Sequence, residues 1–173
     1  LAGVHLDESE MLAGGTRGAN TVLPHLYEST LVAHCAMQLG VSERALDMTA
    51  RYVRERVQFG VPIGSFQAVQ HRAADCYIDL EAMRWTTWRA VERVAQGSPS
   101  ARECAVAKFW AAEGGARIAA ACQHLHGGIG VDLDYPIHRY FLRSKALELA
   151  LGGAMPHLVR LGRDLAESGP SPG

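Results

Sequence analysis

Three histidines and three glycines lie together in the stretch HLHGGIGVDLDYPIHRYF, which spans residues 124–141. Histidine is a common zinc ligand, so the stretch first has to be tested as a metal site. His124 and His126 are two residues apart, and on a helix that spacing points their side chains to different faces. No cysteine or carboxylate stands at the helical spacings that would complete a zinc site with them. We therefore predict that this stretch binds no metal.

The glycines Gly127, Gly128 and Gly130 are also candidates for a phosphate-binding turn. They lack the preceding strand that a dinucleotide fingerprint requires, and they follow a segment with the helical period. One of them can therefore end the helix in the left-handed conformation, and the others would let the backbone approach a flat or anionic ligand. A plain helix terminator and a ligand-binding turn both remain open on these residues alone.

A second candidate site lies in RYVRERVQFGVPIGSFQAVQ, residues 51–70, where one helical segment ends and the next begins. Arginine is favourable near a helix C-terminus without any ligand, because that end carries partial negative charge. Arg54 and Arg56 can thus be explained by the helix itself. However, Arg56 and Phe59 together also offer a cation for a diphosphate and a ring for a base.

The elements that position these two stretches are long helices. Apolar residues recur every three to four positions, which predicts helices over residues 23–57, 66–96, 100–125 and 134–151, followed by a short last helix after Pro156. Short connections between helices of this length favour antiparallel packing. The predicted fold is therefore all-α, an up-and-down four-helix bundle with a short extra C-terminal helix.

On the second helix, the period predicts one core-facing apolar stripe. Its members are Phe66, Val69, Ala73, Tyr77, Leu80, Trp88, Val91 and Ala95.

Local residue types add predictions about where the elements begin and end. Ser65 is placed to cap the second helix, and Ser100 with Glu103 has the spacing of a capping box at the start of the third. Residues 1–21 carry a glycine cluster and no helical period, which predicts an extended piece and a loop. Residues 168–173 are rich in glycine, proline and serine and predict a disordered tail.

Composition excludes several classes of protein. The 173 residues are 48% hydrophobic, enough for one domain with a substantial core, and the formal net charge is -1. Such a balance draws the chain neither to nucleic acid nor to an anionic membrane, and no segment has the length and apolarity of a membrane span or a signal peptide. We expect a cytoplasmic protein.

The four cysteines are far apart and are predicted to be reduced core residues: Cys35, Cys76, Cys104 and Cys122.

Taken in order, four motifs resemble the carboxy-terminal helical domain of the acyl-CoA dehydrogenases. They are R-x-x-FG-x-x-I-x-x-FQ-x-x-Q, the alanine-rich AVAKFWAAE, H-GG-IG and D-YP-x-x-R. Each motif is weak alone, but the ordered set is specific to the family. The resemblance implies that residues 1–21 are the remnant of a middle β-domain and its linker, and that residues 22–167 form the C-terminal helical bundle.

The resemblance also implies a cofactor, FAD, bound mainly by a neighbouring subunit. In the family, the residues that match Arg56, Phe59 and Gln67 contact its ADP portion, and the Gly-Gly pair approaches the same portion across the dimer interface. His124 stands where the family usually has glutamine, with Gln123 beside it. The full set of implied cofactor-binding residues is Arg56, Gln58, Phe59, Ile63, Gln67, His124, Gly127 and Gly128.

The family's catalytic glutamate is missing from the positions that match it. In the implied reaction, this glutamate removes an α-proton from an acyl-CoA thioester while a hydride leaves for the flavin. The matching residue after the fourth helix is Gly152, and the alternative position on the first helix is Thr30. Neither can accept the proton. Glu28 and Glu148 are the remaining candidates for the base.

The sequence thus predicts the C-terminal domain of an FAD-dependent acyl-CoA dehydrogenase that acts on an acyl-CoA substrate. Its role would be to supply oligomer contacts, in a homo- or hetero-oligomer such as a dimer of dimers, and the ADP side of a shared FAD site. The missing base indicates a subunit of a heteromeric enzyme, inactive as an isolated piece. Two alternatives remain open: a non-catalytic scaffold subunit without flavin, and a flavin monooxygenase of the same fold.

Overall fold

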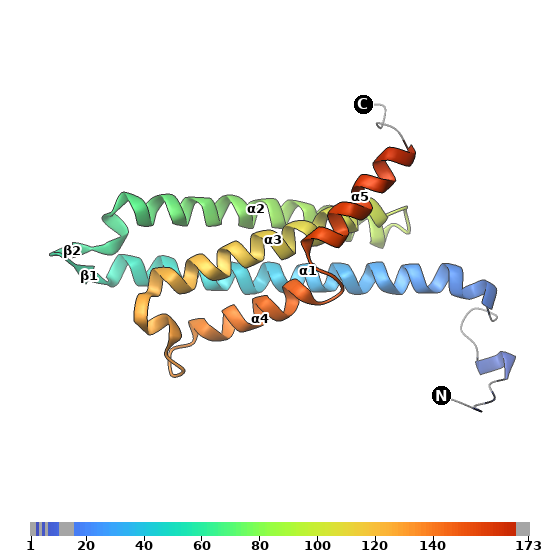
Figure 1. Ribbon diagram of the computed structural model, residues 1–173, viewed down its shortest axis with the longest axis horizontal. Helices are drawn as coiled ribbons and strands as arrows, with labels where there is room; N and C mark the ends of the chain where they lie inside the picture. Colours follow the sequence, from blue (N-terminus) through green and yellow to red (C-terminus); the bar gives the residue numbers. More distant parts are fainter. Residues whose placement is uncertain (1–2, 4, 6, 11–15, 169–173) are drawn as a thin grey trace.

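Five α-helices build an elongated bundle, seen in the computed structural model that describes residues 3, 5, 7–10 and 16–168 (Figure 1). Helices α1 to α4 alternate in direction along the long axis, and α5 leaves the bundle at an angle. The predicted all-α, up-and-down bundle with an extra C-terminal helix is confirmed. The elements are η1 (Glu8–Glu10), α1 (Thr16–Glu55), β1 (Val57–Gln58), β2 (Val61–Pro62), η2 (Ile63–Ser65), α2 (Gln67–Ala95), α3 (Ala101–His126), η3 (Gly127–Val131), α4 (Ile137–Leu149) and α5 (Ala154–Ser168).

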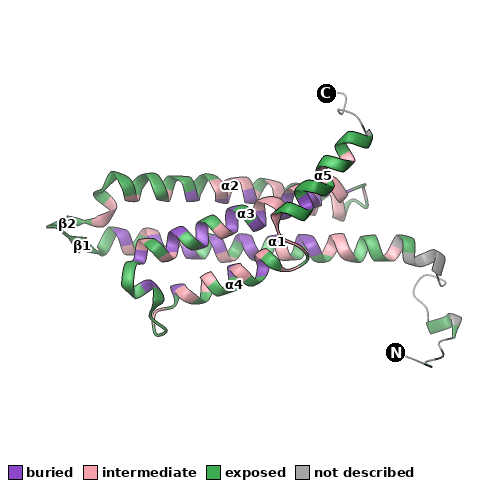
Figure 2. Cartoon of the chain, viewed as in Figure 1, coloured by how far each residue is buried: buried purple, intermediate pink, exposed green. Residues whose placement is uncertain are grey.

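Helix α3 is the centre of the bundle and contacts α1, α2, α4 and α5. Its buried positions cover a broad arc rather than one narrow stripe (Figure 2), whereas the exposed side carries Glu113, Arg117, Ala120 and His124. Most of these positions hold alanine, glycine or cysteine, and such small side chains let neighbouring helices approach closely. A helix surrounded in this way fixes the relative positions of its four neighbours.

The four cysteines are free and buried, as predicted for small core residues. Burial in apolar surroundings disfavours the thiolate. It raises the pKa of Cys35 and Cys76 to about 12, and that of Cys104 and Cys122 to about 11. These thiols therefore remain protonated and unreactive at neutral pH.

A buried polar chain links α1, α3 and α4 at their closest approach. The amide Nε2 of Gln38 donates to Ser42 Oγ at 3.2 Å and to Ser144 Oγ at 2.8 Å. The hydroxyl of Ser144 donates in turn to the carbonyl oxygen of Gly115 at 3.2 Å. A Cβ atom at Gly115 would lie 2.1 Å from Gln38 Nε2, so only glycine leaves room for this amide.

Two predictions about chain termini differ from the structure. Helix α1 begins at Thr16, so the prediction of a loop is wrong for residues 16–21. Pro24 lies inside α1, where it removes one backbone donor without ending the helix. Other parts of the predicted extended piece and of the predicted tail fall outside the described residues, namely 1, 2, 4, 6, 11–15 and 169–173.

The two predicted helix caps are wrong, the first because of a local partner and the second because of tertiary partners. Ser65 Oγ donates to a carbonyl of the preceding turn rather than to α2, whose first residue follows Phe66. The hydroxyl of Ser100 donates to the carboxylate of Glu28 on α1, and Glu103 accepts a hydrogen bond from Arg93 on α2. Ser100 and Glu103 therefore bind residues of other helices instead of forming the capping box that their spacing predicted.

The predicted core stripe of α2 is also partly wrong. Leu80 is buried as expected, but Tyr77 and Trp88 are exposed. The buried side of α2 consists of Cys76, Leu80, Met83, Thr87 and Ala90. Small and medium side chains fit against the closely packed α3, whereas the large aromatic rings face outward.

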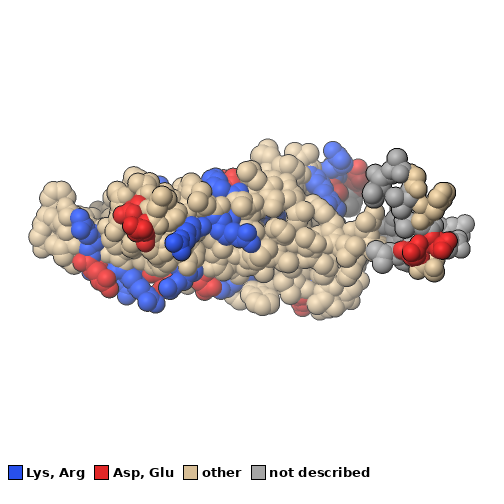
Figure 3. All heavy atoms as spheres, turned by 90° about the horizontal axis from the view of Figure 1, so that it is seen from below, with Lys and Arg blue, Asp and Glu red and all other residues tan. Residues whose placement is uncertain are grey.

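The surface carries both signs of charge, interspersed in the view of Figure 3. Many of the charges form ion pairs within one helix, such as that between Arg44 and Asp47 at 2.6 Å and that between Lys145 and Glu148 at 2.6 Å. Exposed pairs of this kind contribute little stability. Over the described residues, no helix combines the length and apolarity needed to cross a membrane.

We predict that Gly115→Ala destabilises the bundle by about 1–3 kcal/mol, because the added methyl group displaces the buried amide of Gln38. The free energy of unfolding in urea measures this effect. Gly40→Ala is the matched control, since no described atom lies within 4 Å of a Cβ at that helical position. The control is expected to leave stability unchanged or raise it by up to about 1 kcal/mol. Equal effects of the two substitutions would contradict the packing argument.

Candidate functional site

The two helix breaks that the sequence singled out lie at the same end of the bundle. The β1–β2 hairpin and η3 both lie at the end of the bundle where α1 and α3 finish (Figure 1). Tyr52 on α1 joins them, because its hydroxyl donates to the carbonyl oxygen of His126 at 3.2 Å. The rings of Tyr52 and His126 also stack, with centroids 4.4 Å apart. The ends of α1 and α3 are thus held together by a polar and an aromatic contact.

The first break is a tight two-residue hairpin. Val57 and Gln58 of β1 pair with Pro62 and Val61 of β2. The turn residues Phe59 and Gly60 both have positive φ, 53° and 81°, as a hairpin turn that matches the strand twist requires. Phenylalanine is unusual in that conformation.

Phe59 is the most exposed large apolar side chain of the described residues, at 91%. Its ring contacts the edge of Phe66, with centroids 6.2 Å apart. The hairpin therefore presents an aromatic ring beyond the end of the bundle. An apolar surface in that position is suited to a flat ligand or a neighbouring subunit.

Arg56 is held by its backbone while its side chain stays available. Its N–H donates to Tyr52 O at 2.8 Å, and its carbonyl oxygen accepts from the N–H of Ile63 at 2.8 Å. The guanidinium is exposed and forms no hydrogen bond or ion pair with any residue that the structure describes. Ile63 is half-buried and ties the hairpin to α1, and the side chains of Gln58 and Gln67 are exposed beside it.

The second break shows that the three glycines have different roles. Gly127 ends α3 with φ 63° and ψ -142°, so a glycine does terminate the helix at a positive φ, but the predicted left-handed helical conformation is wrong. Gly130 is buried, and a Cβ there would meet Gln123 O at 2.6 Å, so this glycine serves the fold. Around Gly127 and Gly128, no described atom lies within 4 Å of a Cβ position. Those two glycines therefore leave the backbone open to an approaching molecule.

Buried polar atoms beside the glycine turn lack partners in the bundle. The Nδ1–H of His126 donates to Cys122 O at 2.7 Å, which leaves its Nε2 as a bare acceptor. Neither this Nε2 nor Gln123 Oε1 has a hydrogen-bond partner within the described chain. His124, the predicted cofactor residue between them, is exposed. The polar groups at this end are therefore not all satisfied by the bundle alone.

The two positions that match the family's base lie elsewhere on the molecule. Gly152 has φ 91° in the connection between α4 and α5, and a Cβ there would lie 3.3 Å from His157 Nε2. Thr30 is exposed on α1, and its hydroxyl donates to Leu26 O at 2.7 Å. Threonine and glycine offer no proton acceptor of the required strength at either place.

Both remaining candidate bases already have partners. Glu28 accepts the hydrogen bond from Ser100 that ties α1 to the start of α3. The carboxylate of Glu148 lies 2.6 Å from Lys145 Nζ. Each carboxylate is therefore already engaged by a partner within the bundle.

A buried lysine that sequence reasoning passed over fixes the connection between α4 and α5. Lys108 lies on α3, and its Nζ donates to Leu147 O at 2.7 Å and to Glu148 O at 3.3 Å. Burial lowers the pKa of Lys108, but its donors meet the partial negative charge at the end of α4. In the sequence, the lone lysine of the alanine-rich stretch AVAKFWAAE was the feature that could have indicated a buried side chain capping another helix.

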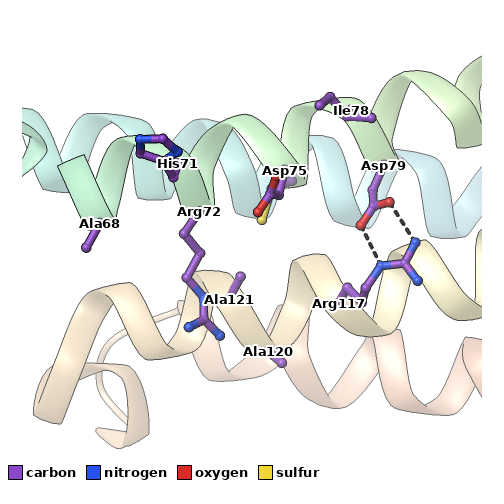
Figure 4. A pocket seen from close by; sticks show the side chains of 10 residues that line it. Ala68, His71, Arg72, Asp75, Ile78, Asp79, Arg117, Ala120 and Ala121 are labelled. Atoms are coloured by element: carbon purple, nitrogen blue, oxygen red, sulfur yellow. Dashed lines mark hydrogen bonds and ion pairs between the residues drawn. The ribbon is translucent and has the colours of Figure 1, made fainter.

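A groove of about 730 Å³ between α2 and α3 is separate from both breaks. Arg117 crosses it to Asp79, with its Nε 2.7 Å from Oδ2 and its Nη2 2.6 Å from Oδ1, and Arg72 extends into it from α2 (Figure 4). The ion pair fills part of the groove. The predicted cofactor-binding residues do not line it. Across the described ranges, no three His, Cys, Asp or Glu side chains gather to hold a metal ion.

Comparison with protein families gives a match over most of the chain. The family model of the acyl-CoA dehydrogenase C-terminal domain matches residues 17–163. The protein "Acyl-CoA dehydrogenase FadE27" of Mycobacterium tuberculosis is 48% identical over 173 residues, which cover 95% of this chain and 46% of the relative. The chain thus spans about half the length of the curated relatives it matches.

Solved structures give the same fold. The crystal structure of the ChsE4–ChsE5 complex from Mycobacterium tuberculosis is 49% identical with a TM-score of 0.86, covering 95% of this chain and 44% of that one. A variant of the Tcur3481–Tcur3483 steroid ACAD is 53% identical with a TM-score of 0.78, covering 81% of this chain and 39% of that one.

We predict that the bundle loses stability as the pH falls below about 6.5, because burial lowers the pKa of His126 and His157 in the folded state. The unfolded chain then binds protons that the folded chain does not, so stability is complete above the unfolded pKa and declines below it. Each histidine contributes a slope of at most about 1.4 kcal/mol per pH unit. Unfolding in urea between pH 8 and 5.5 should show a smaller slope for His157→Gln. An unchanged slope in His157→Gln would contradict the assignment of this pH dependence to His157.

Proposed function

Because the chain belongs to the acyl-CoA dehydrogenase family through its C-terminal domain, we propose that it is part of an FAD-dependent enzyme that introduces an α,β double bond into an acyl-CoA thioester. Its own contribution is oligomer contacts and the ADP side of an FAD site shared between subunits. The observation that carries this proposal is the meeting of the two helix breaks at one end of the bundle. When bound, the flavin accepts the hydride that leaves the substrate.

The residues at this end suit the ADP portion of the cofactor. The guanidinium of Arg56 is available for a diphosphate, and the exposed ring of Phe59 offers a surface for an adenine. Gly127 and Gly128 leave open backbone at the same end of the bundle. Gln58, Ile63, Gln67 and His124 complete the proposed set, with His124 in the place of the family's glutamine. The contact between Tyr52 and His126 holds the two halves of the set in register.

We further propose that the catalytic base comes from a different subunit. Thr30 and Gly152 stand where the family places glutamate, and neither can take the α-proton. Two similar structures carry names that join two proteins, one described as a complex and the other as a steroid ACAD. By analogy, the partner of this chain is a second acyl-CoA dehydrogenase subunit that carries the glutamate. The substrate class is a bulky acyl-CoA thioester such as one derived from a steroid.

We predict that Arg56→Ala weakens FAD binding by at least about tenfold in the full-length protein with its partner, since one charge-assisted hydrogen bond contributes about 1.5–3 kcal/mol. Flavin absorbance after desalting and titration with FAD measure the loss. Arg54→Ala is the matched control, because Arg54 lies two residues before Arg56, in the last turn of α1, and its Nε donates to Ala50 O at 2.9 Å. Undiminished flavin in Arg56→Ala would refute the cofactor role. A wild type without flavin, alone and with the partner, would indicate a scaffold subunit.

We also predict that the full-length chain alone oxidises acyl-CoA at least ~10²-fold more slowly than the same chain with its partner, because the general base contributes about that factor or more. Bleaching of flavin absorbance on adding acyl-CoA measures the rate. Full activity of the lone chain would eliminate the partner. In that case Glu28→Gln and Glu148→Gln would show which carboxylate acts as the base.

A further inference from the structure

The connection between α4 and α5 is a short turn over residues 150–153, and we call it the α4–α5 turn. From the side of α3, Lys108 Nζ donates to the carbonyl oxygens of Leu147 and Glu148, which come just before the turn. Lys108 is 1% exposed and forms no ion pair with any residue that the structure describes. Burying a lysine without a carboxylate partner is unfavourable. The bundle nevertheless buries one at the start of this turn.

From the side of α5, His157 holds the turn itself. Its Nε2–H donates to Leu151 O at 3.0 Å, and a Cβ atom at Gly152 would lie 3.3 Å from the same nitrogen. The other ring nitrogen, Nδ1, is buried and has no hydrogen-bond partner within the described chain. A buried acceptor without a partner is also unfavourable. His157 therefore supports the turn while one of its nitrogens stays unsatisfied.

The backbone of the α4–α5 turn has an unusual conformation. Leu151 has φ 59° and Gly152 has φ 91°. Leucine is unfavourable at a positive φ, and such a residue persists only where its surroundings hold it. The side chain of Leu151 is 37% exposed, so its own packing restrains the backbone little. The N–H of Gly152 reaches Leu149 O only at 3.3 Å. The shorter hydrogen bonds from Lys108 and His157 therefore supply the main restraint.

Three unfavourable features thus meet at one turn: a buried lysine, an unsatisfied histidine nitrogen and a leucine at positive φ. Features of this kind gather where the position of the backbone serves a function. Under the proposed function, Gly152 stands where the family places its glutamate, beside the reacting end of the acyl group. We therefore propose that Lys108 and His157 are positioning residues that hold the α4–α5 turn in the conformation that fits the acyl-CoA thioester. This role rests on the proposed function and adds two residues to it.

Hydrogen exchange of the amides of residues 150–154 tests whether Lys108 holds the turn. In the full-length protein with its partner, Lys108→Met should raise exchange at least about tenfold, because two carbonyls at the end of α4 lose their donor. Lys145→Met is the matched control and should exchange like the wild type. Lys145 is the other lysine of the chain, and it binds the carboxylate of Glu148 at the surface rather than its backbone. Unchanged exchange in Lys108→Met would overturn the inference.

Two variants of His157 test the other side of the turn without a change on α3. His157→Gln keeps an N–H donor within reach of Leu151 O, whereas His157→Leu removes it. Exchange of the turn amides should rise at least about tenfold in His157→Leu, as expected for a lost restraint on a strained backbone, and much less in His157→Gln. Equal exchange in these two variants would show that the hydrogen bond is not the restraint and would overturn the inference.

Turnover per bound flavin tests whether the position of the turn matters for the reaction. Lys108→Met should lower kcat about 10- to 100-fold and change KM less than about threefold, since misplaced reacting groups slow the chemical step by factors of this size. The amount of bound flavin should stay as in Lys145→Met. A merely structural role would lower the yield of folded enzyme but leave kcat per flavin unchanged, and that result would overturn the positioning role.

The two measurements separate this inference from the proposed function. A wild type that binds no flavin with its partner would refute the proposed function, and with it the role of the turn in the reaction. Exchange of the turn amides would still decide whether Lys108 and His157 hold the turn. If the wild type binds flavin and oxidises acyl-CoA while Lys108→Met keeps the wild-type kcat per flavin, the proposed function stands and the inference fails.

Discussion

The structure depends on how closely α1 and α4 approach the central helix α3. The buried amide of Gln38 fits only because Gly115 has no side chain, and Ser144 completes the chain of hydrogen bonds to α4. Small residues on the rest of α3 allow the same closeness on its other sides. A core with so little free volume transmits small changes in side-chain size to all of the surrounding helices. This packing therefore sets the positions of the hairpin end of the bundle and of the connection after α4.

The proposed function lies where the helices stop, because a long helix pairs its own backbone and leaves few polar groups for a ligand. At one end, the contact between Tyr52 and His126 joins the ends of α1 and α3, so the hairpin with Arg56 and Phe59 and the open glycine turn lie at the same end of the bundle. At the end of α4, Lys108 caps the helix and fixes the connection that follows. The same central helix supplies His126 and Lys108, which relates the two ends rigidly.

The helical period of apolar residues predicted much of the fold, but it did not predict the hydrogen-bond partners of the side chains. The helical period located the four long helices, and the glycines marked the end of α3. Ser100 has the spacing of a capping box, yet the nearby carboxylate of Glu28 is a partner that only the tertiary fold supplies. The period also could not tell which of two apolar stripes on α2 faces inward, since that choice depends on the room left by α3. The capping role of Lys108 was not predicted, because its acceptors are backbone carbonyls and every residue type has one.

The two exposed aromatic surfaces lie at separate places on the molecule. Phe59 projects beyond the hairpin end, whereas Trp85 lies on the outer side of α2. From Phe66 to Trp85 the helix advances 19 residues, or about 28 Å. A single contact of standard size that covers the tip of the hairpin would leave the middle of α2 in water. Under the proposed function, the hairpin end is the surface that a neighbouring subunit must reach, because a chain that offers the nucleotide side of a flavin site and no base needs that subunit for catalysis.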